Sequence, residues 1–205
     1  IGLNNLLKVL NLKKIELFLQ IGSSLEYGKK LSPQKENTIC NPISYYGKAK
    51  YKASSLLKKN ISNYVIIRPY QVYGPYQKDN RLIPMVIKSC IENKAFPCSS
   101  GNQERDFLYV DDFISLIIKI IYKKKFKNKI FNIGYGKPVK VKKVINLIFN
   151  IIKKGRPLFG SIRMRKDEIN KLYPDISRVK KEFNWKPKTS LKRGLIKTIN
   201  FYAKN

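Results

Sequence analysis

Apolar residues in the first half of this sequence switch between helical and strand-like spacing. Helical spacing from Leu3 to Leu12 is followed by a short apolar run from Ile15 to Leu19, which predicts a helix and then a buried strand. Helical spacing returns over 46–59, and a β-branched run from Tyr64 to Arg68, closed by Pro69, predicts a second buried strand. Helices that alternate with buried strands are typical of a parallel sheet with crossover helices, so we expect a doubly wound α/β fold.

The chain after Pro75 has shorter and more varied elements. Gly134 and Gly136 interrupt the pattern, and Pro187 separates the last two helices. The elements expected in this part are helices over 82–92, 112–122, 141–154, 176–183 and 191–202, and short strands over 106–110 and 131–133.

The composition is that of a globular protein. With 205 residues, 43% of them hydrophobic, the chain can form one domain-sized core or slightly more. No stretch approaches the roughly 18 apolar residues of a membrane helix, and residues 1–12 lack a basic leader, so we expect no membrane partner and a cytoplasmic location. The three cysteines, Cys40, Cys90 and Cys98, lie far apart and histidine is absent, so neither a disulfide framework nor a metal site is expected.

A formal net charge of +30 raises the question of a nucleic-acid partner. Only eight of the 43 basic residues are arginines, and the lysines are spread over almost every segment. A run such as Lys123 to Lys125 is most simply a solvated helix end. We therefore interpret the excess as a lysine-rich surface and expect no nucleic-acid partner.

The segment N-P-I-S-Y-Y-G-K-A-K contains a candidate proton-transfer pair. Tyr46 and Lys50 are four residues apart, so on a helix the ammonium lies one turn from the phenol on the same face. A free phenol is a poor base at neutral pH, but a fixed cation nearby favours the phenolate. Such pairs also arise by chance in a chain with many tyrosines and lysines, so the assignment depends on the surrounding motifs.

Motifs at the ends of the two predicted strands supply that context. I-G-S-S-L-E-Y-G ends the first strand and R-P-Y-Q-V-Y-G-P ends the second, and ligands of open α/β sheets bind beyond such carboxyl ends. Together with Y-G-x-x-K, R-L-I-P, G-x-Q-x-R-D-F-x-Y-V-D-D and W-x-P, in this order, the motifs resemble the NAD-dependent epimerase/dehydratase family. These are extended short-chain dehydrogenase/reductases that act on nucleotide sugars, and the resemblance covers about Ile15 to Tyr202.

The resemblance implies a catalytic group and a cofactor, NAD or NADP. Ser23 would hold the reacting sugar oxygen, Tyr46 would be the acid/base, and Lys50 would bind the nicotinamide ribose. Pro69 would approach the nicotinamide ring. Taken singly, these residues have ordinary structural interpretations, such as a strand-end cap, a half-buried aromatic and a solvated lysine; their joint order favours the site.

The resemblance also implies contacts with a nucleotide-sugar substrate. Arg81, Arg105 and Arg165 stand where the family meets the nucleotide or its diphosphate, a role that suits guanidinium groups. Gln71 replaces the usual asparagine, which keeps the amide on a longer arm.

The family's domain organisation and assembly carry over as expectations. Residues 1–75 are assigned to the C-terminal part of a Rossmann-like dinucleotide-binding domain. Residues 76–205 are assigned mainly to a smaller α/β substrate-binding subdomain, with some segments returning to the sheet. The family commonly pairs subunits through a four-helix bundle, so we expect a homodimer formed by the helices over 3–12 and 46–59.

One position bears on the type of reaction. The family's 4,6-dehydratases carry a glutamate two residues after the catalytic serine or threonine, and that position here is Leu25. Glu26 is one place further on, and on an extended strand it would face the opposite side. An epimerase or ketoreductase is therefore favoured over a dehydratase, which stays as the alternative because a turn near Gly28 could redirect Glu26.

The Gly-rich turn that cradles the cofactor pyrophosphate in this family has no counterpart in the sequence. We expect the adenosine-binding half of the enzyme to lie upstream, and the 205 residues alone to bind no dinucleotide. The choice between NAD and NADP therefore stays open. An inactive truncated product and a basic polyanion-binding protein stay as alternatives of another class.

Overall fold

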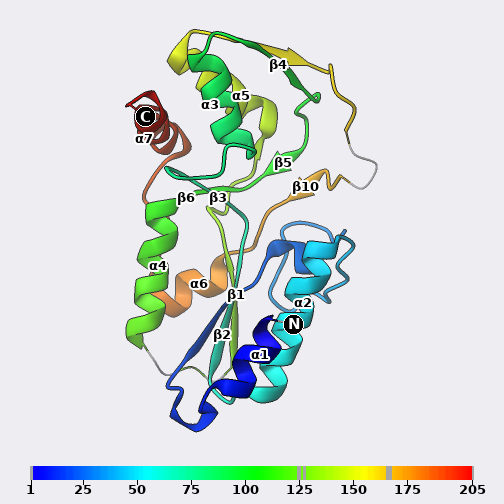
Figure 1. The fold of residues 1–205 in the computed structure, drawn as a ribbon, viewed down its shortest axis with the longest axis vertical. Helices are drawn as coiled ribbons and strands as arrows, with labels where there is room; N and C mark the ends of the chain where they lie inside the picture. Colours follow the sequence, from blue (N-terminus) through cyan, green and yellow to red (C-terminus); the bar gives the residue numbers. More distant parts are fainter. Residues whose placement is uncertain (1, 124–125, 127, 165–167, 205) are drawn as a thin grey trace.

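The computed structural model describes residues 2–123, 126, 128–164 and 168–204 and shows an α/β architecture in two parts (Figure 1). One part is built on a parallel sheet, and the other contains short strands packed with helices. The sheet part is formed by α1 (Gly2–Val9), the 3-10 helices η1 (Leu12–Lys14) and η2 (Ser24–Glu26), α2 (Tyr45–Asn60), α4 (Val110–Lys123), α6 (Ser177–Phe183) and the strands β1 (Phe18–Ile21), β2 (Tyr64–Pro69) and β7 (Lys129–Ile133).

The sheet has the strand order β1-β2-β7, and both pairings are parallel. Phe18 lies opposite Tyr64, and Pro69 at the end of β2 lies opposite Ile133 at the end of β7. The carboxyl ends of the three strands therefore meet at one edge of the sheet. The expected α/β class with parallel strands is confirmed.

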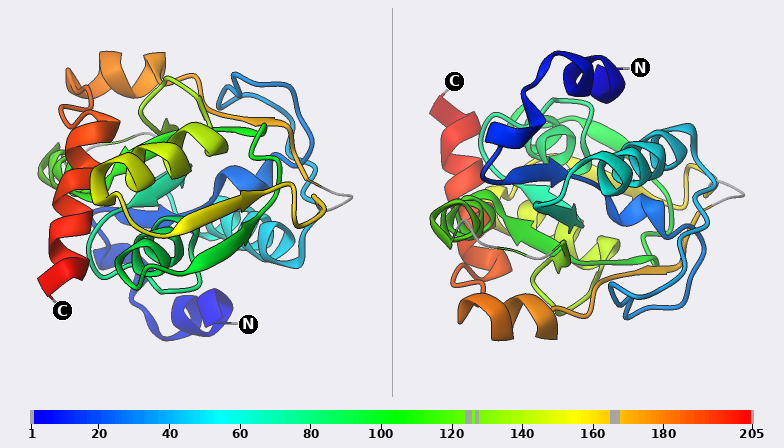
Figure 2. Two further views of the ribbon diagram at one scale, coloured as in Figure 1. Left: turned by 90° about the horizontal axis from the view of Figure 1, so that it is seen from above. Right: turned by 90° about the horizontal axis from the view of Figure 1, so that it is seen from below.

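Successive residues of β2 face opposite sides of the sheet, and both sides are covered by helices. Tyr64 and Ile66 pack with Leu7 of α1 and Leu57 of α2. Val65 and Ile67 pack in a second cluster with Leu116 and Ile120 of α4, and with Val179 and Phe183 of α6. Figure 2 shows the two helix layers on either side of the strands. Burial on both sides explains why β2 is a nearly continuous apolar run.

The second part occupies the upper half of Figure 1. Its core joins α3 (Leu82–Ile91), α5 (Val141–Ile152) and α7 (Leu191–Lys204) with aromatic residues of nearby strands. Its strand pairs are β3 (Gln71–Tyr73) with β6 (Phe107–Tyr109), β4 (Ala95–Cys98) with β9 (Arg156–Phe159), and a three-stranded sheet in the order β10 (Lys171–Leu172), β5 (Glu104–Arg105), β8 (Val139–Lys140).

The strand expected over 106–110 is β6, and the buried Asp106 separates it from the preceding strand β5. β5 ends at Arg105 and β6 begins at Phe107, while the Asp106 side chain accepts hydrogen bonds from the Tyr135 N–H (2.5 Å) and the Gly136 N–H (2.6 Å). Gly134 is required here, because an added Cβ would lie 2.6 Å from Asp106 Oδ1. The glycine turn after β7 therefore binds a carboxylate of the same chain.

Two features are absent from the described residues. None of the described helices is long and apolar enough to cross a membrane. In the same part of the chain, no three histidine, cysteine or acidic side chains are grouped so that they could hold a metal ion.

Removing the Asp106 carboxylate should destabilise the fold. Asp106→Ala leaves the Tyr135 and Gly136 N–H groups without their acceptor, and we expect the free energy of unfolding to fall by roughly 2–4 kcal/mol. Urea denaturation measures the change. The control is Asp111→Ala, because Asp111 is exposed and paired only at the surface with Lys197 (3.2 Å), and its loss should cost about 1 kcal/mol or less. Equal losses for the two variants would contradict the assignment.

Candidate active site

Ser23 lies between the end of β1 and the short helix η2, at the carboxyl edge of the sheet. Its backbone is extended, its N–H donates to Glu26 Oε1 (2.9 Å), and its Oγ accepts from the Leu25 N–H (3.2 Å). These reciprocal bonds form a capping box, which fixes both the backbone and the hydroxyl of Ser23. A serine hydroxyl that accepts one bond still has its own O–H to donate.

Tyr46 and Lys50 lie in the first two turns of the helix α2, which Ser44 caps by accepting a hydrogen bond from the Gly47 N–H (3.0 Å). The Lys50 ammonium lies 5.7 Å from the centre of the Tyr46 ring and donates to the carbonyl oxygen of Ile21 (2.8 Å). Tyr46 is 55% exposed, so solvent and small molecules can reach its side chain. The expected placement of the ammonium and the phenol on one face is observed, and Lys50 also joins α2 to the end of β1.

Gly47 brings the start of α2 against the loop that carries Ser23. A Cβ at position 47 would lie 2.5 Å from the carbonyl oxygen of Leu25, so the two backbones are in contact where only glycine fits without a shift. Ser23 is two residues before Leu25, and Tyr46 directly precedes Gly47, so both lie close to this contact. The structure therefore gathers Ser23, Tyr46 and Lys50 at one corner of the sheet.

Pro69 ends β2 at the same edge and is half-buried. Gln71 follows in β3, where its side chain is exposed and its backbone N–H donates to the Asp106 carbonyl oxygen (3.1 Å). Both residues are at the junction between the sheet and the second part of the molecule.

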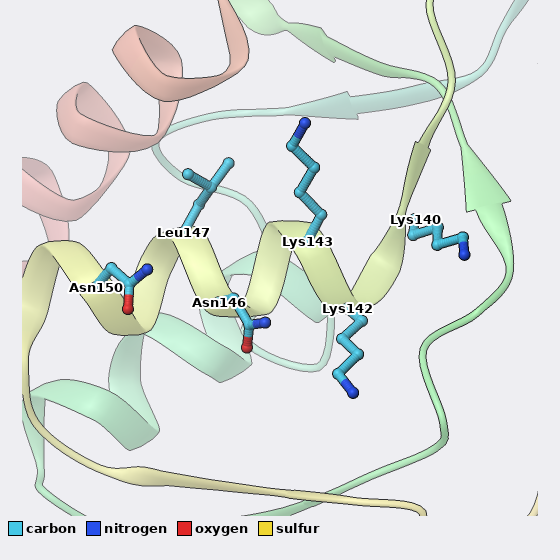
Figure 3. Close-up of a pocket in the computed structure, with 6 residues that line it drawn as sticks. All are labelled: Lys140, Lys142, Lys143, Asn146, Leu147 and Asn150. Atoms are coloured by element: carbon cyan, nitrogen blue, oxygen red, sulfur yellow. The ribbon is translucent and has the colours of Figure 1, made fainter.

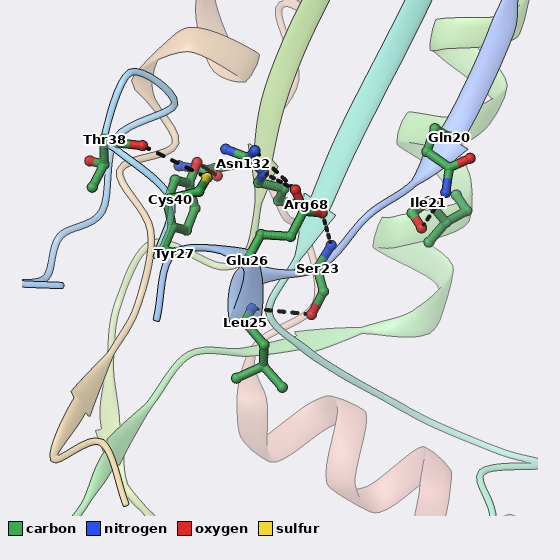
Figure 4. A network of polar contacts seen from close by, with 10 residues as sticks. All are labelled: Gln20, Ile21, Ser23, Leu25, Glu26, Tyr27, Thr38, Cys40, Arg68 and Asn132. Carbon is green, nitrogen blue, oxygen red and sulfur yellow. Dashed lines mark hydrogen bonds and ion pairs between the residues drawn. The ribbon is translucent and has the colours of Figure 1, made fainter. Parts of the chain in front are cut away.

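A buried polar network lies beneath this corner (Figure 4). Glu26 Oε2 accepts from Arg68 Nε (3.1 Å) and Nη2 (3.0 Å), and both side chains are almost fully excluded from solvent. The Arg68 guanidinium lies 4.5 Å from the centre of the Tyr27 ring, and the Tyr27 hydroxyl donates to Asn132 Oδ1 (2.7 Å). Burial raises the pKa of Tyr27 and outweighs the lowering caused by the Arg68 charge, so that the pKa is about 12. Tyr27 is therefore a neutral hydrogen-bond donor.

The geometry of Glu26 corrects one sequence-based expectation. Residues 24–26 form a 3-10 helix and not the extended strand that we expected. The Glu26 side chain is nevertheless buried and paired with Arg68. The position two residues after Ser23 is taken by Leu25, which is half-buried. The capping-box signature S-S-L-E was visible in the sequence and could have revealed the turn.

Two of the arginines expected at the substrate, Arg81 and Arg105, lie in the second part of the molecule. Arg105 is buried in β5 and forms an ion pair with Glu168, and its Nη1 donates to the Glu104 carbonyl oxygen (2.7 Å). Burial lowers the pKa of Arg105, and the carboxylate of Glu168 opposes that change. Arg81 is exposed at the start of α3. Arg165 lies outside the described residues.

A separate surface hollow of about 360 Å³ lies along α5 (Figure 3). It is lined by Lys140, Lys142, Lys143, Asn146, Leu147 and Asn150. Its side chains come from one strand and the helix that follows, and the close-up shows lysines that point outward in different directions. Because the Tyr46 and Ser23 groups are on the sheet part, this hollow is not the corner described above.

Comparison with known proteins identifies the family. The sequence model of the NAD dependent epimerase/dehydratase family matches residues 1–134. The chain belongs to this family. An uncharacterized UDP-glucose epimerase of Bacillus subtilis is 30% identical over 207 residues, and the match covers 98% of this chain and 65% of the relative. The resemblance inferred from the motifs is therefore confirmed.

Solved structures of the epimerase/dehydratase family have the same fold. UDP-glucose 4-epimerase of Thermotoga maritima, solved with UDP-glucose, matches with a TM-score of 0.90 and 27% identity over 99% of this chain and 68% of that one. A dTDP-glucose 4,6-dehydratase of Bacillus anthracis, solved with NAD, matches with a TM-score of 0.87 and 26% identity over 100% of this chain and 67% of that one. The chain thus spans about two thirds of the length of these relatives.

Proposed function

We propose that the protein is an NAD(P)-dependent nucleotide-sugar epimerase or ketoreductase. The observation that carries the proposal is the Tyr46–Lys50 pair, fixed to the end of β1 by the bond from Lys50 to the Ile21 carbonyl and placed beside Ser23. The names of the relatives, a UDP-glucose epimerase and a dTDP-glucose dehydratase, support a nucleotide sugar as the substrate class.

The residues of the corner fit a nicotinamide cofactor. The Lys50 ammonium has three N–H donors, and its bond to Ile21 leaves up to two for the hydroxyls of a ribose. Pro69 offers an apolar surface at the next strand end. A bound NAD or NADP would supply the hydride acceptor and donor. We propose that residues 1–75 hold this side of the site and that residues 76–205 mainly hold the substrate.

Tyr46 and Ser23 would carry out the proton chemistry. The phenolate of Tyr46 would accept the proton of the sugar hydroxyl, with NAD(P) as the acceptor of the hydride from the same carbon, and the phenol would return a proton when the carbonyl is reduced. The Ser23 hydroxyl, fixed by its bond with the Leu25 N–H, donates to the same sugar oxygen. The positive charge of Lys50, one helical turn away, would attract the negative charge of the Tyr46 phenolate.

The state of Glu26 supports an epimerase or ketoreductase over a 4,6-dehydratase. Elimination of water needs an additional carboxylate that faces the sugar, and Glu26 is fully buried in its pair with Arg68. The test is to supply the intact protein with NAD and either UDP-glucose or dTDP-glucose and to identify the product by NMR. A sugar inverted at one carbon supports the proposal, and a 4-keto-6-deoxy product would establish the dehydratase instead.

Removing the Tyr46 hydroxyl tests the acid/base assignment. We expect Tyr46→Phe to lower kcat on the order of a hundredfold or more, the usual scale for general acid/base catalysis, with little change in nucleotide-sugar binding. Tyr45→Phe is the matched control, because Tyr45 is in the same helical turn and 93% exposed. Near-normal turnover by Tyr46→Phe would refute the assignment.

Substrate affinity should depend on arginine side chains. We propose that Arg81, Arg105 and Arg165, with Gln71, contact the nucleotide sugar. Arg105→Ala should weaken binding of UDP-glucose by about 2 kcal/mol or more, because a charged hydrogen bond in a buried site is lost. Calorimetric titration measures the change. Arg193→Ala, an exposed arginine on α7, removes the same charge and should have little effect. Equal losses would favour general attraction of polyanions.

We further propose that the protein forms a homodimer through α1 and α2. Both helices pack on the sheet through Leu7 and Leu57, yet Leu6 and Val9 of α1 and Tyr51 of α2 leave apolar surface exposed. Two copies of this helix pair would cover that surface in a four-helix bundle.

A single charge at this surface should separate the subunits. Val9 is 81% exposed, so Val9→Asp should leave the subunit folded but shift the mass measured by light scattering from dimer to monomer. Ile121→Asp, on the exposed face of α4, is the control and should leave the mass unchanged. A wild-type monomer at micromolar concentration would contradict the proposal.

A further inference from the structure

The guanidinium of Arg68 is a buried charge in the sheet part. Arg68 is 1% exposed and sits at the end of an otherwise apolar strand, where an unpaired charge would be strongly unfavourable. Its counter-charge is Glu26, which is fully buried. Buried ion pairs can often be replaced by apolar residues without loss of stability. The presence of this pair at the corner of the site therefore points to a role other than stability.

The second oxygen of the carboxylate indicates that role. While Oε2 binds Arg68, Oε1 accepts the Ser23 N–H (2.9 Å). One carboxylate thus connects the backbone of Ser23 to the end of β2. Glycine at position 22 leaves room for the Glu26 carboxylate, because an added Cβ there would lie 2.4 Å from Glu26 Oε1 and 3.0 Å from the Ile67 carbonyl oxygen.

Arg68 extends the connection to the third strand of the sheet. Its guanidinium lies over the Tyr27 ring, and Tyr27 donates to Asn132 in β7. Asn132 Nδ2 in turn donates to the Gln34 carbonyl oxygen (2.9 Å). The network therefore spans the ends of β1, β2 and β7. Because Pro69 directly follows Arg68, the ion pair also relates the position of Ser23 to that of Pro69.

We propose that Glu26 is a positioning residue that holds the Ser23 hydroxyl in line with Tyr46, and that Arg68 is retained to hold the Glu26 carboxylate. The inference rests on the proposed function of Ser23. A carboxylate is suited to the task because it accepts from a guanidinium and a backbone N–H at once. An apolar residue at position 26 would leave the Ser23 N–H without its acceptor.

The decisive variant replaces both charges together. Glu26→Val with Arg68→Met removes the pair without leaving a lone buried charge, so we expect the variant to stay folded, with the urea midpoint lowered only by the cost of the Ser23 N–H that loses its acceptor. If Glu26 only stabilises the fold, this double variant has wild-type kcat. If Glu26 positions Ser23, kcat falls about tenfold or more with KM nearly unchanged. Lys123→Met with Glu182→Leu removes an ion pair between α4 and α6 and is the control.

A cycle with Ser23→Ala tests whether the effect passes through the hydroxyl. Once the hydroxyl is absent, removing the Glu26–Arg68 pair should cause no more than a twofold further loss in kcat, because the two changes act on one group. A further tenfold loss in the Ser23→Ala background would show that the pair acts elsewhere and overturn the proposal.

Hydrogen exchange tests the anchor without any turnover. In the intact protein the Ser23 amide should exchange slowly, and in the double variant its exchange should be at least tenfold faster, while amides of α4 are unchanged. Unchanged protection of Ser23 would overturn the inference. If the wild-type protein transfers no hydride although the amide responds as expected, the proposed function fails and the role of Glu26 as the anchor of Ser23 stands.

Discussion

Parallel pairing of three strands decides where the candidate site lies in this molecule. Because β1, β2 and β7 run in the same direction, their carboxyl ends reach one edge, and the residues that follow each strand meet there. Ser23 and Gly134 lie just after β1 and β7, and Pro69 is the last residue of β2. The helix α2, which connects β1 and β2, begins at the same edge. Tyr46 and Lys50 in its first two turns therefore lie close to Ser23. An antiparallel arrangement would divide these residues between opposite edges.

The acidic residues of the chain are few, and several act as acceptors for backbone N–H groups. The sequence has 13 of them against 43 basic residues. Asp106 accepts from the glycine turn after β7, and Asp112 accepts from Lys188 (3.0 Å) and Thr189 (2.9 Å) before α7. Glu26 does the same for Ser23. The lysine-rich surface and the carboxylates that organise loops are thus two separate uses of charge, and the net charge alone gives no indication of the second.

The elements that the sequence predicts well are those with long amphipathic or β-branched runs. The helix expected over 46–59 is α2 (Tyr45–Asn60), and the strand expected over 64–68 is β2 (Tyr64–Pro69). The short strands β4 and β9 were not predicted, because Ala95–Cys98 and Arg156–Phe159 each contain a proline and become a sheet only by pairing with one another.

In the candidate site, too, contacts between residues close in the sequence could be predicted, and contacts between distant residues could not. Tyr46 and Lys50 are one helical turn apart, so their proximity could be predicted from spacing alone. The partner of Arg68 is 42 residues away in the sequence, and no local pattern pairs them. An arginine inside an apolar strand does predict a buried counter-charge, yet only the folded chain shows that it is Glu26. Likewise, the proximity of Arg105 to Glu168 depends on how β5 and the segment before β10 come together.

The position of Arg68 on β2 restricts the register in which this strand can pair with its neighbours. Arg68 lies on the same side as Tyr64 and Ile66, whereas Val65 and Ile67 face α4 and α6. A slip of one residue would turn the guanidinium into that apolar cluster, away from Glu26, and would bring an isoleucine to the carboxylate. Such a register error leaves two buried charges unpaired. The ion pair therefore selects one alignment of β2 among its competitors, even where it adds little to the stability of the alignment that is selected.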